Sequence, residues 1–155
     1  MLIPLFSARL YLILLYYRRW YRLLIDANIL LDVLQNREPH VRTSTVIWKL
    51  CETEKARGCV SVLSFANLVY VMRKELDAKK IEETLKALSL IFEFADFNVS
   101  DLIRAAEMKW DDFEDAVQSA TAERLHADYI ITRNVKDFAR SRVTAFTPSE
   151  LLARI

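Results

Sequence analysis

The sequence predicts an α/β protein built on one parallel sheet of four to five strands, and two patterns lead to this prediction. Short apolar runs, such as residues 23–25 and 130–131, are typical of strands buried on both faces. Strand-like and helix-like segments alternate along the chain, with a helical hairpin inserted in the middle. This order predicts a parallel sheet with right-handed crossovers.

The composition fits one globular domain in a reducing compartment. A chain of 155 residues with 53% hydrophobic and 28% charged residues can bury a core without disulfides or a structural metal. Cys51 and Cys59 lack the spacing of a zinc site, so we expect buried thiols and a cytoplasmic protein. A single glycine, Gly58, excludes glycine-rich phosphate loops. The net charge of +1 neither indicates nor excludes a nucleic-acid partner.

Residues 1–22 differ from the rest, because an apolar run at 10–17 is followed by Arg18, Arg19 and Arg22. The run is shorter than the roughly 20 residues of a spanning helix, and its charges follow it, unlike those of a secretory signal. Three interpretations remain: a membrane-surface segment, a helix that packs on a partner, or an upstream extension. We favour the extension, because a complete domain spans residues 23–155.

The first strand, residues 23–25, ends in Asp26, where open α/β sheets bind ligands. Apolar residues at helical spacing follow it, and Asn28 is a plausible cap for that helix. The alternative is that Asp26 only caps the helix.

The middle of the chain predicts three helices and two strands. A helix over residues 41–57 ends at Gly58, a natural stop, and a buried strand follows at 59–63. Ser64 caps a helix that runs to residue 73 and carries Asn67 on its first turn. A helix over 79–93 and an edge strand at 94–97 complete this part.

The second informative segment places Asp111, Asp112, Glu114 and Asp115 at the start of a helix, after a helix over 101–110 capped by Ser100. Adjacent carboxylates repel one another unless they are solvated, helix-terminal or metal-bound. A helix start would need only one or two of them.

The C-terminal part predicts two strands and a helix. The apolar strand within residues 128–134 leads into a turn at 135–138, which carries Asp137, and a last strand covers 143–146. Thr147, Pro148 and Glu150 then form a strong helix start, with a cap and a capping-box acid.

Acids therefore follow three separate strand or helix ends: Asp26, the 112–115 cluster and Asp137. Carboxylates without nearby His or Cys favour hard divalent ions such as Mg²⁺ or Mn²⁺. Such an ion can lower the pKa of bound water and stabilise a phosphoryl transition state.

Three segments carry a resemblance to a known family: LIDANILLD at 24–32, DFEDA at 112–116 and ITRNVKDF at 131–138. In this order they resemble the PIN domain, in particular the VapC-type toxins of type II toxin–antitoxin pairs. The resemblance implies a three-layer α/β fold and a metal-dependent ribonuclease site.

By position in the motifs, Asp26, Asp115 and Asp137 match the metal-binding acids of the family. Asn67 stands where many members have a glutamate, so it offers a neutral carbonyl oxygen as a metal ligand. Residues expected to support the site are Asn28, which matches the residue that orients the first acid, with Asp112, Glu114, Thr132 and Asn134.

The function that follows is a Mg²⁺- or Mn²⁺-dependent endoribonuclease, a toxin with an RNA substrate, a cognate antitoxin and a homodimeric state. Candidate phosphate contacts are Arg37, Arg73, Lys74, Arg133 and Lys136. The apolar stripes of the helices over 41–57 and 79–92 could serve a dimer or the core. The alternatives are a non-catalytic PIN-like binding module and a protein that is phosphorylated on Asp26, for which a second acid and a lysine are lacking.

Overall fold

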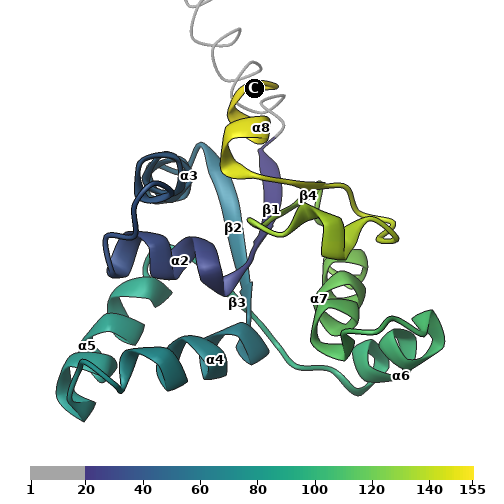
Figure 1. Ribbon diagram of the computed structural model, residues 1–155, viewed down its shortest axis with the longest axis horizontal. Coiled ribbons are helices and arrows are strands. Elements are labelled where there is room, and N and C mark those ends of the chain that lie inside the picture. The colour runs from purple at the N-terminus through teal and green to yellow at the C-terminus, as the bar shows by residue number, and fades with distance from the viewer. Residues whose placement is uncertain (1–19) are drawn as a thin grey trace, which may run out of the picture.

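Five parallel strands form the centre of the computed structural model, which describes residues 20–155 (Figure 1). Their order across the sheet is β3-β2-β1-β4-β5, so β1 is central. This confirms the predicted fold class. The strands are β1 (Tyr21–Ile25), β2 (Ala56–Ser61), β3 (Glu93–Ala95), β4 (Tyr129–Ile131) and β5 (Ala145–Phe146).

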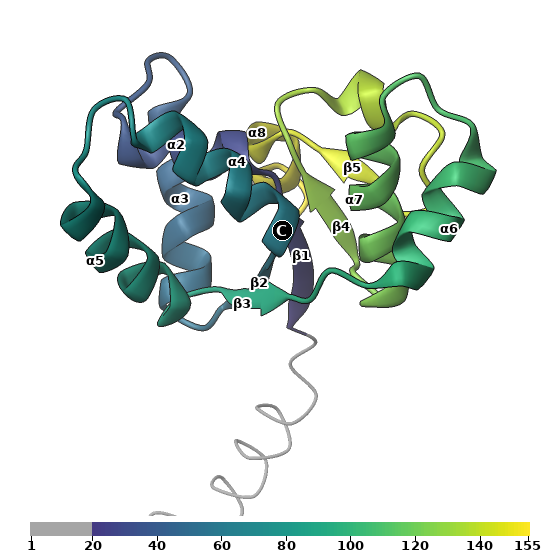
Figure 2. The same ribbon diagram turned by 90° about the horizontal axis from the view of Figure 1, so that it is seen from below.

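Helices cover both faces of the sheet and make three layers, as Figures 1 and 2 show. One face carries α2 (Ala27–Leu34), α3 (Val41–Glu52), α4 (Val62–Met72) and α5 (Ala78–Ser89). The other face carries α6 (Val99–Met108) and α7 (Phe113–Arg124), and α8 (Pro148–Leu152) follows β5.

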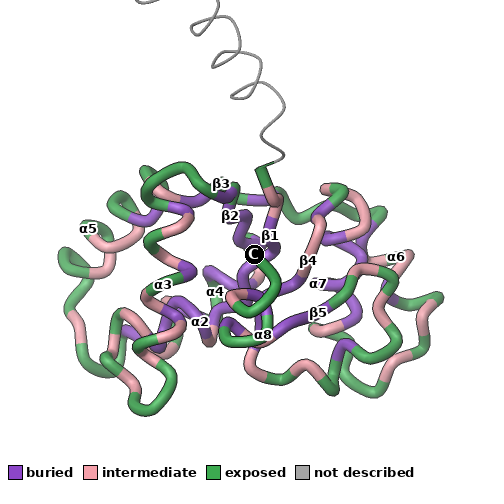
Figure 3. The backbone as a smooth tube through the Cα atoms, turned by 90° about the horizontal axis from the view of Figure 1, so that it is seen from above, coloured by how far each residue is buried: buried purple, intermediate pink, exposed green. Residues whose placement is uncertain are grey.

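The alternation of side chains along β1 supplies both halves of the core. Leu23 and Ile25 pack into the cluster under α2–α5, whereas Leu24 packs with α7 on the other face. All three are buried, which explains why this part of β1 is apolar throughout (Figure 3 colours the chain by burial). Ile81 and Leu85 of α5 also pack against the first cluster, so this predicted stripe serves the core.

The chain order creates a switch point between β1 and β4. From β1 the chain moves outward to β2 and β3, then returns to place β4 on the other edge of β1. The connections therefore diverge at the carboxyl ends of β1 and β4, where open α/β sheets bind ligands. Asp26 and Thr132 directly follow these two strand ends.

Gly58 lies inside β2 and does not end a helix, so this part of the prediction was wrong. The preceding helix α3 already ends at Glu52. A Cβ atom at position 58 would lie 2.7 Å from the Sγ atom of Cys51 and 2.7 Å from Phe92. The glycine is needed because α3 and the segment before β3 approach the strand closely.

Three helices begin earlier than predicted. Asp26, Ser61 and Asn98 have extended backbones, and each accepts a hydrogen bond from a first-turn N–H. The predicted caps, which lie two or three residues later inside α2, α4 and α6, are Asn28, Ser64 and Ser100. Asn67 consequently lies on the second turn of α4.

The last predicted helix start is confirmed. Thr147 caps α8 and forms a capping box with Glu150, and Pro148 is the first helical residue. Both cysteines are free, buried thiols, as predicted.

The interpretations of residues 1–22 fall mostly on residues 1–19, which lie outside the described residues. Within residues 20–155, no helix has the length and apolar character required to cross a membrane.

Candidate active site

Asp26 both caps a helix and faces the end of the neighbouring strand. Its Oδ1 accepts a 3.4 Å hydrogen bond from the backbone N–H of Asn28 at the start of α2. Its Oδ2 accepts a 2.8 Å bond from the hydroxyl of Thr132, which follows β4. Both side chains are buried. The capping interpretation is therefore correct but incomplete, because Asp26 also joins β1 to β4.

Two further sequence-predicted residues lie beside this pair. The Asn28 side-chain amide lies 3.5 Å from Oδ2 of Asp26. The backbone N–H of Asn134 donates to the Thr132 hydroxyl at 3.1 Å, which directs the hydroxyl proton toward Asp26. Asn134 thus acts here through its backbone, and Thr132 and Asn28 donate to one carboxylate oxygen.

The acidic residues at the start of α7 have different roles. Asp112 is the cap, because its Oδ1 accepts the N–H groups of Glu114 at 2.9 Å and Asp115 at 3.2 Å. Glu114 is exposed and Asp115 is half-buried. One acid therefore satisfies the helix start, as predicted, and the carboxylates of Glu114 and Asp115 are left for another role.

Asn67 meets this cluster across the sheet. Its side-chain amide donates a hydrogen bond to Oε1 of Glu114, which joins α4 to α7. The two residues are separated by 47 positions in the sequence. Asn67 of α4 therefore contacts a glutamate supplied by another helix, α7.

The carboxylates are close enough to perturb one another. Burial and the charges of Asp112, Asp137, Asp26 and Glu114, in that order, raise the pKa of Asp115 to about 7. Asp26 and Asp137, which come from separate elements, therefore both act on Asp115.

Glu114 lies within the same field. Burial and the charges of Asp112 and Asp26 raise the pKa of its carboxyl, and the hydrogen bond from Asn67 opposes them. A concentrated negative field at a strand-end cleft is a common property of functional sites.

A cleft of about 310 Å³ lies beside these acids. It brings Asp115 together with Asp137 of the 3-10 helix η1 (Val135–Phe138) and with the cations Lys136 and Arg140. Trp110 and Arg140 carried no motif signal in the sequence, although each lies within a few residues of a motif. The complete lining is Trp110, Asp111, Asp112, Asp115, Lys136, Asp137 and Arg140.

The donor chemistry of the cluster fits Mg²⁺ or Mn²⁺. The available ligands are carboxylate and amide oxygens, and burial and the neighbouring carboxylates raise the pKa of Asp115, so a divalent cation would offset the negative charge there. As they lie, no three His, Cys, Asp or Glu side chains in residues 20–155 form a group that could hold a metal ion. Side-chain movement would therefore accompany binding.

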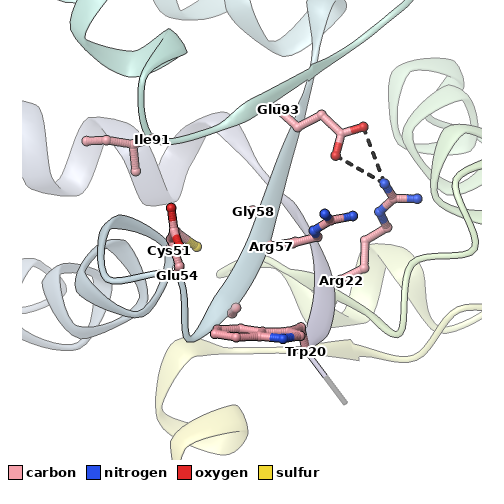
Figure 4. Close-up of a pocket in the computed structure, with 9 residues that line it drawn as sticks. Trp20, Arg22, Cys51, Glu54, Arg57, Gly58, Ile91 and Glu93 are labelled. Carbon is pink, nitrogen blue, oxygen red and sulfur yellow. Dashed lines mark hydrogen bonds and ion pairs between the residues drawn. The ribbon is translucent and has the colours of Figure 1, made fainter. Parts of the chain in front are cut away.

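A larger cavity, of about 510 Å³, lies at the opposite end of the strands (Figure 4). Trp20, Arg22 and Arg57 line it near the amino ends of β1 and β2, and Arg22 forms an ion pair with Glu93 there. Because ligands of open α/β sheets bind at the carboxyl ends, this cavity is not the candidate site despite its size.

Comparisons with known proteins agree with the fold. A model of the PIN domain matches residues 22–136. The toxin-antitoxin complex from Klebsiella pneumoniae has 25% identity and a TM-score of 0.62, covering 81% of this chain and 96% of that chain. FitAcB from Neisseria gonorrhoeae has 20% identity and a TM-score of 0.64, covering 82% of this chain and 98% of that chain.

A VapC toxin from Mycobacterium tuberculosis, described as sarcin-ricin loop cleaving, has 11% identity and a TM-score of 0.57, covering 70% of this chain and 86% of that chain. No curated protein sequence matches the chain significantly. The family model alone covers well over half of the chain, and its span includes Asp26, Asn67 and Asp115. The chain belongs to the PIN domain family.

Proposed function

We propose that this protein is a metal-dependent endoribonuclease, the toxin of a toxin–antitoxin pair. The observation that carries the proposal is the shared field of Asp26, Asp115 and Asp137, which come from three separate elements. Such convergence at a topological switch point is expected of a catalytic site and not of a chance surface cluster.

In this proposal Asp26, Asp115 and Asp137 hold a Mg²⁺ or Mn²⁺ ion, and the amide oxygen of Asn67 is an additional ligand. The bound ion would supply a water of lowered pKa and stabilise charge on the phosphoryl group. Hydrogen bonds from Thr132 and Asn28 orient the Asp26 carboxylate.

The residues around the cleft can serve the substrate. Lys136 and Arg140 line the cleft beside the acids, and in this proposal they contact RNA phosphates. Arg73 and Lys74 are exposed and lie over the ring of Tyr70, which forms a second basic surface with an aromatic face.

The proposed partners are an antitoxin and a second copy of the chain, in the cytoplasm. The solved complexes from Klebsiella pneumoniae and Neisseria gonorrhoeae support the antitoxin. Val99 and Ile103 lie one turn apart on α6 and are exposed, so they offer an apolar face for a homodimer. Sedimentation of the wild type beside Ile103→Lys tests this state, and equal masses that match a monomer would contradict it.

The experiment is cleavage of mixed RNA by the full chain with EDTA, Mg²⁺ or Mn²⁺. Asp115→Asn removes a proposed ligand, whereas Glu83→Gln removes an exposed acid on α5 and serves as the matched control. Metal-dependent cleavage that is lost only in Asp115→Asn supports the nuclease. A folded wild type that binds RNA but cleaves nothing in either metal contradicts it and favours a binding module.

A further inference from the structure

A line of polar contacts leads from Asp26 to a fully buried carboxylate. The Asn28 amide lies next to Asp26, and its Oδ1 accepts a 3.2 Å hydrogen bond from Nη2 of Arg133. Nη1 of the same guanidinium lies 3.3 Å from Oδ1 of Asp32, whose side chain has 0% exposure. Ser44 donates to the other Asp32 oxygen at 3.0 Å. The contacts therefore join α2, α3 and the segment after β4.

Arg133 determines how the Asn28 amide can be oriented. A guanidinium only donates hydrogen bonds, so the amide oxygen must face Arg133 and the NH₂ group must face Asp26. If the amide turned around, its oxygen would face the carboxylate of Asp26 and repel it. Arg133 thus fixes a donor against the proposed metal-binding acid.

Asp32 in turn determines where Arg133 lies. A carboxylate without exposure requires a cation, and the hydrogen bond from Ser44 satisfies only one of its oxygens. Arg133 was a candidate phosphate contact from the sequence, but in the structure its two terminal nitrogens are directed at Asn28 and Asp32.

We propose that Arg133 and Asp32 are positioning residues that act through Asn28 to hold the Asp26 carboxylate in one orientation. This inference rests on the proposed nuclease for its consequence, which is tighter binding of the divalent ion. Such partners of metal ligands typically contribute about 10–100-fold to metal affinity or activity.

The competing explanation is an ordinary ion pair that only stabilises the fold, and the chain provides a matched control for it. Asp101 of α6 pairs with Arg124 at 2.8 Å, with side-chain exposures of 2% and 29%. The corresponding exposures of Asp32 and Arg133 are 0% and 27%. The control pair joins α6 to the last turn of α7, so it lies at the other end of α7 from Asp115.

The variants remove both charges of each pair together, so that no buried charge is left alone. One full-length variant combines Arg133→Gln with Asp32→Asn, and the control combines Arg124→Gln with Asp101→Asn. A third variant, Arg133→Lys, keeps a cation for Asp32, but one ammonium cannot reproduce the fork that contacts two partners. It keeps the test decisive if the first variant does not fold.

The first readout is Mn²⁺ affinity, measured by electron paramagnetic resonance, with RNA cleavage beside it. We expect about 10–100-fold weaker Mn²⁺ binding in Arg133→Gln/Asp32→Asn and in Arg133→Lys. The Arg124/Asp101 control should bind like the wild type. Equal losses in the two pairs, or wild-type binding by Arg133→Lys, would overturn the inference.

The second readout needs neither metal nor RNA. The side-chain NH₂ signals of Asn28 in the metal-free protein should be sharp in the wild type and in the control, and shifted and exchange-broadened in Arg133→Lys. If the wild type fails to bind Mn²⁺ or cleave RNA, the proposed function fails, and these signals still test the positioning. Unchanged Asn28 signals in Arg133→Lys would refute it.

Discussion

The repulsion among the acids makes a prediction about stability that is independent of catalysis. Asp115→Asn should abolish the proposed activity and at the same time stabilise the metal-free protein at neutral and alkaline pH. Asparagine has almost the shape of the protonated aspartic acid and carries no charge. The substitution therefore removes a charge that is disfavoured by burial and by the charges of Asp112, Asp137 and Asp26.

The sign follows from proton linkage. Folding raises the pKa of Asp115 from the ordinary value of 3.8 to about 7. Between these values the folded state binds more protons than the unfolded state, so the free energy of unfolding falls as pH rises. Stability contributed by the protonated carboxyl is complete below the unfolded pKa and is lost as the pH passes through about 7.

The size of the stabilisation by Asp115→Asn follows from the same shift in the pKa of Asp115. A rise from 3.8 to about 7 sets a ceiling of about 4 kcal/mol. Because Asp115 is only half-buried, solvent screening reduces this to about 1–2 kcal/mol. For a chain of this size the gain corresponds to roughly 2–8 °C in Tm.

The assay is thermal unfolding of the wild type, Asp115→Asn and the Glu83→Gln control in EDTA, near pH 8 and near pH 4. The gain of Asp115→Asn should be present near pH 8 and absent near pH 4, where the wild-type carboxyl is protonated. Added Mn²⁺ should reverse the order, because it stabilises only a protein that binds it. A gain of the same size at both pH values would refute the electrostatic reasoning.

Three further predictions concern single contacts. Thr132→Val should weaken Mn²⁺ binding about 10-fold in a titration, because it removes the hydroxyl donor to Asp26, whereas Thr132→Ser should retain it. Gly58→Ala should lower stability by about 1–3 kcal/mol in urea unfolding through its clash with Cys51, and Cys51→Ala should restore part of the loss; an unchanged midpoint would contradict this. Thr147→Ala should cost about 1 kcal/mol by removing the α8 cap, with no change in Mn²⁺ affinity.

The sequence was informative where local chemistry and topology agree. An apolar run that ends in Asp26 indicates both a buried strand and a polar group at its carboxyl end, and the structure shows both. The 3-10 helix that carries Asp137 likewise comes shortly after the carboxyl end of β4, the strand that pairs with β1. Parallel pairing then brings these ends to one edge of the sheet without further information.

The contacts that the sequence did not reveal depend on side chains far apart in the chain. In the sequence, Gly58 follows a helical pattern and is typical of a helix end. Only the close approach of Cys51 in the structure shows that the strand requires a glycine at this position. Arg133 resembles an ordinary surface cation until Asp32 is seen to be buried beside it. These contacts depend on how elements that are distant in the sequence pack together, and no local sequence pattern predicts that packing.

The pairing of Asn67 with Glu114 gives the proposed metal site a physical basis for lacking a glutamate on α4. A glutamate at position 67 would place a carboxylate against Glu114, whose carboxyl already has a raised pKa beside Asp112 and Asp26. The asparagine instead donates a hydrogen bond to Glu114, which opposes the rise in the pKa of that carboxyl. In the proposed nuclease, Glu114 of α7 therefore supplies a carboxylate beside Asn67, where α4 itself supplies only a neutral amide.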